Sequence, residues 1–259
     1  MSQWARLRSV LAAVDVPQSA GAWMDGIVAK TAIAHPLRRE SEQALRENSV
    51  HVLSFVNAHG FNMAAKQGDF AQALMASDTL LRDGSGMKIL MKLLGRDPGA
   101  NLNGTDLIPL IIDKFAEAGA PIAFMGTAEP WLARAAEAAK DRGATIALLT
   151  DGFQTEQHYV DQLARSPCRL VVLGMGMPKQ ERVAMMIREH LDGPMLVVNG
   201  GAILDFLAGR FPRAPKWLRA LGLEWLFRLV REPGRLFQRY VIGNGVFLWR
   251  AMRLKLGAA

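Results

Sequence analysis

The sequence predicts an α/β fold in which a parallel sheet lies between two layers of helices. Four apolar runs in the second half are continuous and end in glycine or turn residues, and helical stretches separate or follow them. Continuous apolarity is typical of strands buried on both faces, and the helices between them provide right-handed crossovers. The expected architecture is therefore a three-layer, Rossmann-like parallel sheet with flanking helices.

The first half of the chain supplies strands and helices of the same kind. Apolar residues recur at helical spacing after the first β-prone run, and a loop rich in glycine and proline spans residues 95–104. We expect strands at 51–57 and 77–84, and helices at 59–75, 87–94 and 105–118.

The second half has the clearer patterns. Its four continuous apolar runs predict strands at 121–126, 145–150, 169–176 and 195–201. Helices are expected at 129–142, 155–165, 179–191 and 201–208. The sequence has no internal repeat of solenoid length and no low-complexity segment, which argues against a repeat architecture.

Three regions are expected along the 259 residues, and they differ in charge. Residues 1–45 are irregular in pattern and form an extension of unassigned role, residues 46–209 form the α/β domain, and residues 210–259 form a basic, aromatic appendage. The appendage contains eleven Lys and Arg against two Glu, a net charge of +9, whereas the rest of the chain carries −2. This separation of charge indicates an anionic partner.

The arginines of the appendage have helical spacing. Steps of three, four and four residues place four of them on one face of a helix: Arg228, Arg231, Arg235 and Arg239. Pro233 is expected to kink or divide this segment. A solvated charged face, nucleic acid and an anionic membrane with a diphosphate ligand are all open. The last fits best, because arginine forks phosphate oxygens and tryptophan prefers the bilayer interface.

Composition and motif searches exclude several classes of protein. Cys168 is the only cysteine, so a disulfide framework is excluded and a reducing, cytoplasmic compartment is expected. No run of 18 apolar residues predicts a transmembrane helix, and no convincing export signal is present. A Walker A motif is absent, and the Gly174-Met175-Gly176 turn lacks the third glycine of a dinucleotide fingerprint. No cluster of metal-ligating side chains is found, although a loosely associated Mg²⁺ with a nucleotide stays open.

Ligands of such sheets bind beyond the carboxyl ends of the strands, so the residues after each strand are the candidates for chemistry. Asp83 follows the second strand among small residues. It is either a capping or turn aspartate or a general base that faces a cleft. His59 follows the first strand, but a lone histidine is more often structural.

A series of short motifs follows the predicted strands and continues into the appendage. The motifs are Asn57, Asp83-Gly84-x-Gly86, Gly104-x-Asp106-Leu107, Gly126, Asp151-Gly152-Phe153, Gly176-x-Pro178-Lys179-Gln180-Glu181, Gly200-Gly201-Ala202-x-x-Asp205-x-x-Ala208-Gly209, Arg213-Ala214-Pro215-x-Trp217 and Gly222-Leu223-Glu224-Trp225-x-x-Arg228-x-x-x-Glu232-Pro233. Over residues 50–240 they resemble the WecG/TagA/CpsF family of bacterial glycosyltransferases, glycosyltransferase family 26. The last three motifs together are highly specific.

The resemblance implies a reaction and a set of site residues. It implies inverting transfer of a hexose or N-acetylhexosamine from a UDP-sugar to a polyprenyl-diphosphate-linked sugar in surface or exopolysaccharide biosynthesis, at the inner face of the cytoplasmic membrane. Asp83 is then the candidate base, and Gln180 lies by the donor. Binding of the UDP-sugar is implied for Asn57, Gly126, Gly152, Phe153, Gly176, Lys179, Glu181 and Asp205, and binding of the acceptor or its diphosphate for Arg213, Arg228, Arg231 and Arg235.

The partners implied are the UDP-sugar, the lipid-linked acceptor and an anionic membrane surface, without nucleic acid; self-association of the chain is left open. No tightly bound cofactor or metal is expected. Two departures leave the transferred sugar open between the N-acetylmannosamine type and another sugar: Asn101 stands where members commonly have arginine, and Phe55 where they tend to have threonine. The alternative is a non-catalytic module of the same fold that binds a nucleotide or a lipid.

Overall fold

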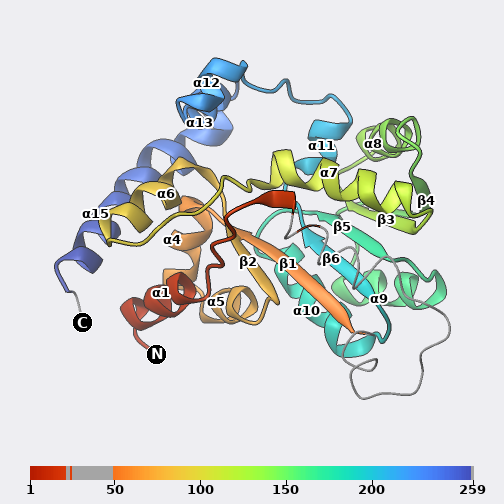
Figure 1. Cartoon of the computed structure of the whole chain (residues 1–259), viewed down its shortest axis with the longest axis horizontal. Coiled ribbons are helices and arrows are strands. Elements are labelled where there is room, and N and C mark those ends of the chain that lie inside the picture. Colours follow the sequence, from red (N-terminus) through yellow and green to blue (C-terminus); the bar gives the residue numbers. More distant parts are fainter. Residues whose placement is uncertain (22–23, 25–48, 258–259) are drawn as a thin grey trace.

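A single parallel sheet forms the centre of the molecule. The computed structural model describes residues 1–21, 24 and 49–257, and the strands of that part have the order β2-β1-β6-β5-β3-β4 (Figure 1). They are β1 (Val50–Val56), β2 (Thr79–Arg82), β3 (Pro121–Gly126), β4 (Thr145–Thr150), β5 (Leu170–Gly174) and β6 (Met195–Asn199). Every neighbouring pair is parallel, so the carboxyl ends of all six strands meet at one edge. The predicted sheet is confirmed.

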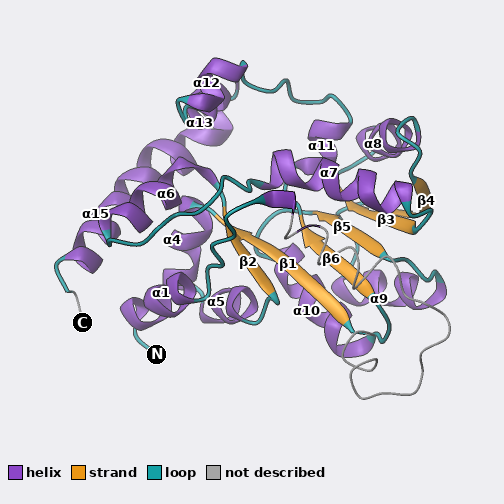
Figure 2. Cartoon of the chain, viewed as in Figure 1, coloured by secondary structure: helices purple, strands orange, loops and turns teal. Residues whose placement is uncertain are grey.

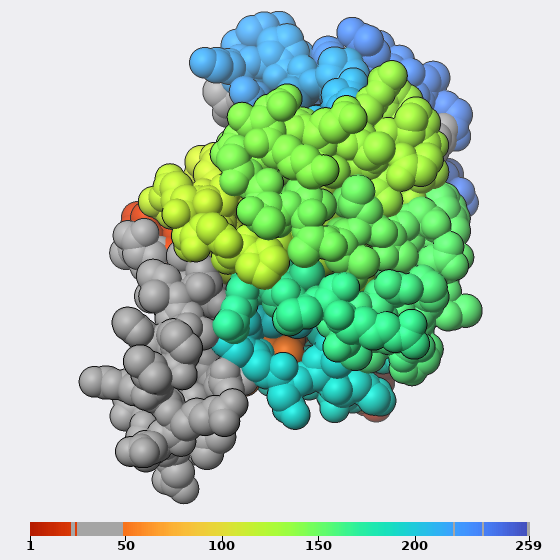
Figure 3. Space-filling view, turned by 90° about the vertical axis from the view of Figure 1, so that its right-hand side faces the viewer, coloured from red at the N-terminus to blue at the C-terminus, as the bar shows by residue number. Residues whose placement is uncertain are grey.

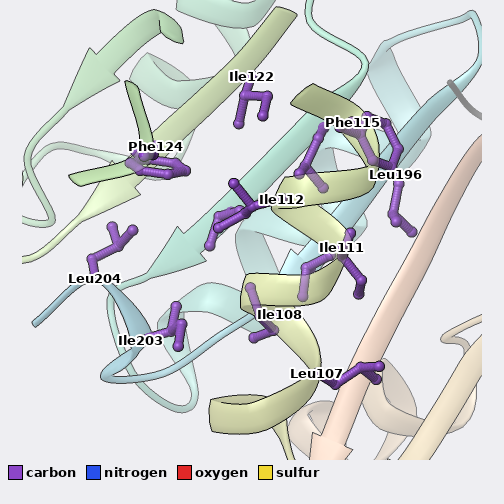
Figure 4. Packing of buried hydrophobic residues seen from close by; sticks show 14 of the residues in the cluster. Leu107, Ile108, Ile111, Ile112, Phe115, Ile122, Phe124, Leu196, Ile203 and Leu204 are labelled. Atoms are coloured by element: carbon purple, nitrogen blue, oxygen red, sulfur yellow. The ribbon is translucent and has the colours of Figure 1, made fainter. Parts of the chain in front are cut away.

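Helices cover both faces of the sheet (Figure 2). One face packs against α7 (Gly104–Glu117), α8 (Trp131–Lys140) and α11 (Ile203–Leu207), and the other against α9 (Glu156–Arg165) and α10 (Lys179–His190). Along β5, Leu170 and Val172 belong to the first core and Val171 and Leu173 to the second, as the alternation of a strand requires. Figure 4 shows the first core, in which side chains of α7, β3, β6 and α11 point into one cluster. The three-layer architecture is confirmed.

The edge strand β4 departs from the predicted pattern. Its residues alternate between exposed and partly buried up to the buried Thr150, and Leu149 is 39% exposed. The prediction that this apolar run is buried on both faces is therefore wrong, because β4 has one neighbour and α8 packs against it from one side. This side of the molecule faces the viewer in Figure 3, where the middle of the sequence, in green, covers most of the surface.

The start of the chain packs on the body rather than extending from it. Helix α1 (Gln3–Ala12) buries Trp4, Leu7, Val10 and Leu11 against α4 and α5. Asp15 then joins the edge of β2, because its backbone N–H donates to the Leu80 carbonyl and its carboxylate accepts from the Leu80 N–H, each at 2.8 Å. The expected irregular extension thus contains a helix, and its remaining residues 22–23 and 25–45 lie outside the described part.

The helix predicted at 59–75 is divided. Gln67 has an extended backbone, which ends α4 (Ala58–Lys66) and begins α5 (Gly68–Met75). Gly68 follows directly, and glycine in a helix interior is less stable than alanine by roughly 0.5–1 kcal/mol, which favours a break at this point. The short α6 (Gly84–Leu93) follows β2 and completes this end of the molecule.

The appendage is a chain of short helices. They are α12 (Lys216–Ala220), α13 (Glu224–Arg231), α14 (Pro233–Phe237), the π-helical turn η1 (Gln238–Ile242) and α15 (Gly243–Lys255). Pro233 divides the segment as predicted, because it begins α14. The four arginines therefore do not share one continuous helix, contrary to the simple spacing argument.

The last helix of the appendage belongs to the core of the body (Figure 1). Phe247 is 2% exposed and packs edge-on against Phe61 of α4, with ring centroids 5.7 Å apart. Arg250 donates to the side-chain oxygen of Asn62 at 2.6 Å, and Asn62 donates to the carbonyl of Gly243 at 2.7 Å. These contacts fix the appendage to α4.

Replacement of Phe247 tests this anchoring. Phe247→Ala removes a fully packed ring, so we expect the free energy of unfolding to fall by about 3–5 kcal/mol in urea titrations. Leu248→Ala changes the exposed side of the same helix and is expected to stay within about 0.5 kcal/mol of the wild type. Equal effects of the two changes would contradict the packing of α15 on the body.

Candidate active site

The carboxyl ends of four strands surround a cavity of about 310 Å³. The residues after β1, β2, β5 and β6 form its floor, and α13, α14 and η1 of the appendage contribute further walls. The predicted site residues that line it are Asn57, Asp83, Gly176, Gln180, Asp205 and Arg228. The cavity also contains residues that were not predicted for the site, above all His59 and Arg239.

Asp83 lies at the end of β2. Its backbone bonds to β1, and its side chain lines the cavity. Its N–H donates to the carbonyl of Val56 at 2.8 Å, which fixes its position beside the end of β1. Although Asp83 occupies the N-cap position of α6, its carboxylate makes no capping hydrogen bond. Of the two roles left open by the sequence, capping is therefore not observed, and the carboxylate lines the cavity instead.

The surroundings of Asp83 favour the protonated, neutral form of its carboxyl more than bulk water does. Loss of solvation raises the pKa of the carboxyl, and the negative charge of Glu224 adds to this rise. A side-chain hydrogen bond from Asn57 and the charges of Arg239 and Arg228 act in the opposite direction. A carboxylate with a raised pKa is a stronger base, which suits removal of a proton from a hydroxyl.

Asn57 connects the end of β1 to Asp83. Its side-chain oxygen accepts from the backbone N–H groups of His59 and Gly60 at 3.1 and 3.0 Å, and thereby caps α4. Because the oxygen is used in this cap, the NH₂ group is left to donate to the carboxylate of Asp83. Asn57 therefore orients the carboxylate while holding the first turn of α4.

Gln180 holds two loops of the site together from below. Its side chain is 1% exposed, and its oxygen accepts from the N–H groups of Gly176 and Gly201 at 3.2 and 3.0 Å. Its NH₂ group donates to the Glu181 carboxylate at 2.9 Å. These bonds use the oxygen and one N–H of the amide. Through them, Gln180 positions the loops that follow β5 and β6.

Glu181 is fully buried beneath the same loops. Burial raises the pKa of its carboxyl to about 7, while the hydrogen bond from Gln180 acts against this rise. The second carboxyl oxygen has no hydrogen-bond partner among the described residues. Glu181 does not line the cavity, so the structure separates it from the residues that reach a ligand there.

Gly126 at the end of β3 and Lys179 after β5, both predicted to bind the UDP-sugar, have structural contacts with neighbouring backbone. A Cβ atom on Gly126 would lie 2.3 Å from the carbonyl carbon of Gly174, so only glycine fits between these strands. Lys179 donates to the carbonyls of Gly152 and Gln154 at 2.9 and 2.6 Å, which holds the turn after β4. Gly126, Gly152 and Lys179 do not line the cavity themselves, whereas Gly174 does.

Two residues expected to hold the uridine of the donor, Phe153 and Asp205, lie in different surroundings. Phe153 is 78% exposed on the turn after β4 and does not line the cavity. Asp205 does line it, accepts from the Thr127 hydroxyl at 2.6 Å and pairs with Arg210 at 3.0 Å. Thr127 has a φ of 46°, which is unusual for a branched residue.

The four predicted arginines have different partners. Arg213 pairs with Asp106 at 2.6 Å and with Glu224 at 3.6 Å, so it joins the appendage to α7 rather than facing the cavity. Arg228 lines the cavity, and its Nε is buried without a hydrogen-bond partner in the described structure. Arg231 stacks on Phe227 at 5.3 Å outside the cavity, and the side chain of Arg235 lies outside the described residues.

Two residues of the cavity were missed or discounted by sequence reasoning. Burial and the positive charge of Arg239 lower the pKa of His59 to about 4, so its ring is neutral near pH 7. The position of His59 after β1 was a signal for the cavity, whereas the place of Arg239 depends on η1. Phe55 also lines the cavity, and Asn101 accepts from Arg82 at 3.5 Å outside it.

Two features of the described part of the chain bear on metal ions and membranes. No three or more His, Cys, Asp or Glu side chains in this part come together as a group suited to hold a metal ion. No helix in residues 1–21, 24 or 49–257 has the length and apolar character needed to cross a membrane.

The buried carboxyl of Glu181 predicts how stability depends on pH. The folded state keeps its proton up to about pH 7, whereas the unfolded chain releases it above about pH 4.3. The unfolding free energy therefore falls as the pH rises between these values, by about 2–3 kcal/mol from pH 5 to pH 8. We expect Glu181→Gln to remove this part of the slope in urea titrations, and the exposed Glu189→Gln to leave it. An unchanged slope in Glu181→Gln would contradict the raised pKa.

Comparison with known proteins places the chain among glycosyltransferases. A family model described as "Glycosyl transferase WecG/TagA/CpsF family" matches residues 27–259, a wider range than the expected 50–240. A relative from Bacillus spizizenii (strain ATCC 23059 / NRRL B-14472 / W23) is 31% identical over 169 residues, which span 64% of this chain and 65%, just under two thirds, of the relative. A relative from Bacillus subtilis (strain 168) is 26% identical over 187 residues, or 71% and 73% of the two chains.

Both relatives are described as an N-acetylglucosaminyldiphosphoundecaprenol N-acetyl-beta-D-mannosaminyltransferase. The family match covers the sheet, the cavity and the whole appendage, so the motifs that suggested the family lie in one continuous match. The chain belongs to the WecG/TagA/CpsF family of glycosyl transferases.

Proposed function

We propose that this chain transfers a hexose or N-acetylhexosamine, of the N-acetylmannosamine type, from a UDP-sugar to a polyprenyl-diphosphate-linked sugar. The two relatives carry names for a reaction of this class. The observation that carries the proposal is the carboxylate of Asp83, which makes no cap and lines the same cavity as Arg228. A base and a cation in one cavity are what transfer from a sugar diphosphate to a hydroxyl requires.

In the proposed reaction, Asp83 accepts the proton of the acceptor hydroxyl. The hydroxyl oxygen forms a bond to the anomeric carbon of the donor sugar, and the bond from that carbon to the diphosphate oxygen breaks. The electron pair leaves with UDP, and a single displacement inverts the configuration at the anomeric carbon. Asn57 keeps the carboxylate oriented through its side-chain NH₂ group.

The negative charge of the diphosphate groups is offset by arginine in this proposal. Arg228 has a buried Nε without a hydrogen-bond partner among the described residues, which suits an anionic ligand in the cavity. We propose that Asp205 and the turn at Asp151–Phe153 hold the uridine end. A tightly bound metal is not part of the proposed mechanism, because the side chains of the appendage supply the positive charge.

A second proposed role of the appendage is attachment to the inner face of the cytoplasmic membrane. Its helices expose large apolar side chains next to basic ones, and α13 has no buried residue in the described structure. The exposed apolar residues are Trp217, Leu221, Leu226, Val230, Phe237, Val241, Ile242, Val246, Leu248, Trp249, Met252 and Leu256. Apolar and cationic groups on one element are typical of helices that lie in a membrane interface.

The non-catalytic alternative keeps the cavity but uses it only for binding. Transfer assays with a panel of UDP-sugars and a polyprenyl-diphosphate-linked sugar distinguish the two functions. Release of UDP with formation of a glycosylated acceptor supports the transferase and identifies the donor. Binding of UDP without release or transfer from any donor supports the binding module.

Substitution of Asp83 tests the base. Asp83→Asn keeps the size of the side chain and removes its basicity, so we expect kcat to fall by about 10²–10⁴ while UDP still binds. Asp69→Asn, at an exposed aspartate in the first turn of α5, is expected to keep wild-type turnover. Near-normal turnover of Asp83→Asn would show that Asp83 is a turn residue.

Vesicle binding tests the membrane surface. The full chain is expected to bind anionic vesicles at low salt and to be released as salt rises, because charges near a surface are screened. Val241→Glu with Ile242→Glu places charge on the exposed part of η1 and should weaken binding about tenfold or more. Leu110→Glu, an equally exposed change on α7, is the control. Wild-type affinity of the double variant would place the membrane surface elsewhere.

A further inference from the structure

A second, smaller cavity lies beside the active site. It has a volume of about 190 Å³ and is formed by the segment after α11 together with α13 and the turn that follows it. We name it the aromatic slot, and its lining residues are Phe211, Pro212, Phe227, Arg228, Arg231 and Glu232. Three of the six are apolar rings, and two are arginines.

Arg228 belongs to both cavities. It lines the active-site cavity near Asp83, whose pKa it lowers, and it also lines the aromatic slot. Its guanidinium stacks on Phe206 at 5.2 Å, and its Nε is buried without a hydrogen-bond partner among the described residues. A cation with an unused donor therefore stands between a polar cavity that contains a base and a small apolar one.

This order matches the chemistry of one kind of substrate. In a polyprenyl-diphosphate-linked sugar, the diphosphate separates the sugar hydroxyls from the isoprene chain. The protein presents matching groups in the same order. Asp83 in the polar cavity matches the sugar hydroxyls, Arg228 between the two cavities matches the diphosphate, and the aromatic slot matches the isoprene chain. Arg231, which stacks on Phe227 at 5.3 Å, adds a second cation at the slot.

We propose that the aromatic slot binds the isoprene unit next to the diphosphate of the acceptor. The inference rests on the proposed function, to which it adds a binding site for the lipid. A volume of about 190 Å³ is large enough for a five-carbon isoprene unit. Burial of such a group contributes affinity through its apolar area.

The lining of the slot distinguishes this ligand from a nucleobase. A uracil ring needs hydrogen-bond partners for its carbonyl and N–H groups, because buried polar groups without partners are costly. The slot offers the rings of Phe211, Pro212 and Phe227, and its two guanidinium groups stack on rings, Arg228 on Phe206 and Arg231 on Phe227. An apolar, branched hydrocarbon fits the three rings without requiring further polar partners.

Transfer kinetics with two soluble acceptors test the proposal. Both acceptors carry N-acetylglucosamine on a diphosphate; one ends in a geranyl group and the other in a methyl group. For the full-length protein we expect Phe227→Ala to raise KM about tenfold for the geranyl acceptor and to leave KM for the methyl acceptor unchanged. An effect through Arg231 or the diphosphate changes both acceptors equally and would overturn the assignment. Phe227→Leu, which keeps an apolar group, is expected to recover most of the loss.

A matched control and a binding measurement complete the test. Ile89→Ala removes an exposed apolar side chain from α6, outside both cavities and the membrane surface, and should leave both KM values unchanged. Calorimetric titration with farnesyl diphosphate and with pyrophosphate needs no catalysis, so it separates failure of this inference from failure of the proposed function. The slot predicts tighter binding of farnesyl diphosphate to the wild type and loss of that difference in Phe227→Ala. Equal affinities in the wild type, or loss of UDP binding instead, would overturn the proposal.

Discussion

The parallel pairing of β1 with β6 is the constraint on which the site depends. Leu53 of β1 lies opposite Val198 of β6, although 145 residues separate them. One half of the site, with Asn57, follows β1, and the other half, with Gln180, lies beside the ends of β5 and β6. A buried hydrogen bond of 2.8 Å from Asn199 to Ser54 joins the two halves below the cavity.

Small buried groups then set the shape of the floor. Gln180 holds the loops after β5 and β6 at a fixed separation through two backbone N–H groups. Gly126 permits the close approach of β3 to β5, where any Cβ atom would collide with Gly174. Because these groups are buried and bonded, they fix the floor of the cavity, whereas its other wall comes from α13, α14 and η1, of which α13 and η1 have no buried residue in the described structure. Such a division is suited to the lipid-linked substrate proposed above.

Two of the attachments of the appendage differ in chemistry. Phe247 is buried at the far end by apolar contacts, and Arg213 pairs with Asp106 near the cavity. Between these two anchors the helices carry Arg228 to the cavity and to the aromatic slot. The basic side chains of the appendage therefore fall into two groups. Arg228 and Arg239 line the cavity inside the protein that also contains Asp83, and the others that the structure describes lie outside it.

Much of this protein was predictable from its sequence, because local patterns determine local structure. Continuous apolar runs identified the strands, Pro233 marked the division of the appendage, and the position of Asp83 after a strand indicated the edge of the sheet where it lies. These features depend on backbone preferences and on the burial of neighbouring residues. The alternating exposure of β4 was not predictable, since it depends on which strand stands at the edge.

The assignment of individual site residues required the tertiary structure. Lys179, Glu181 and Arg213 occur in family motifs, yet their side chains bind a turn, lie buried, or hold the appendage. Arg239 and the aromatic slot depend on how η1 and α13 lie over the sheet, a contact between distant parts of the chain. The sequence by itself determined the strands, most helices of the body, the family and the residue types available for catalysis. Only the folded chain decided which of them share a cavity, because that depends on packing between residues far apart in sequence.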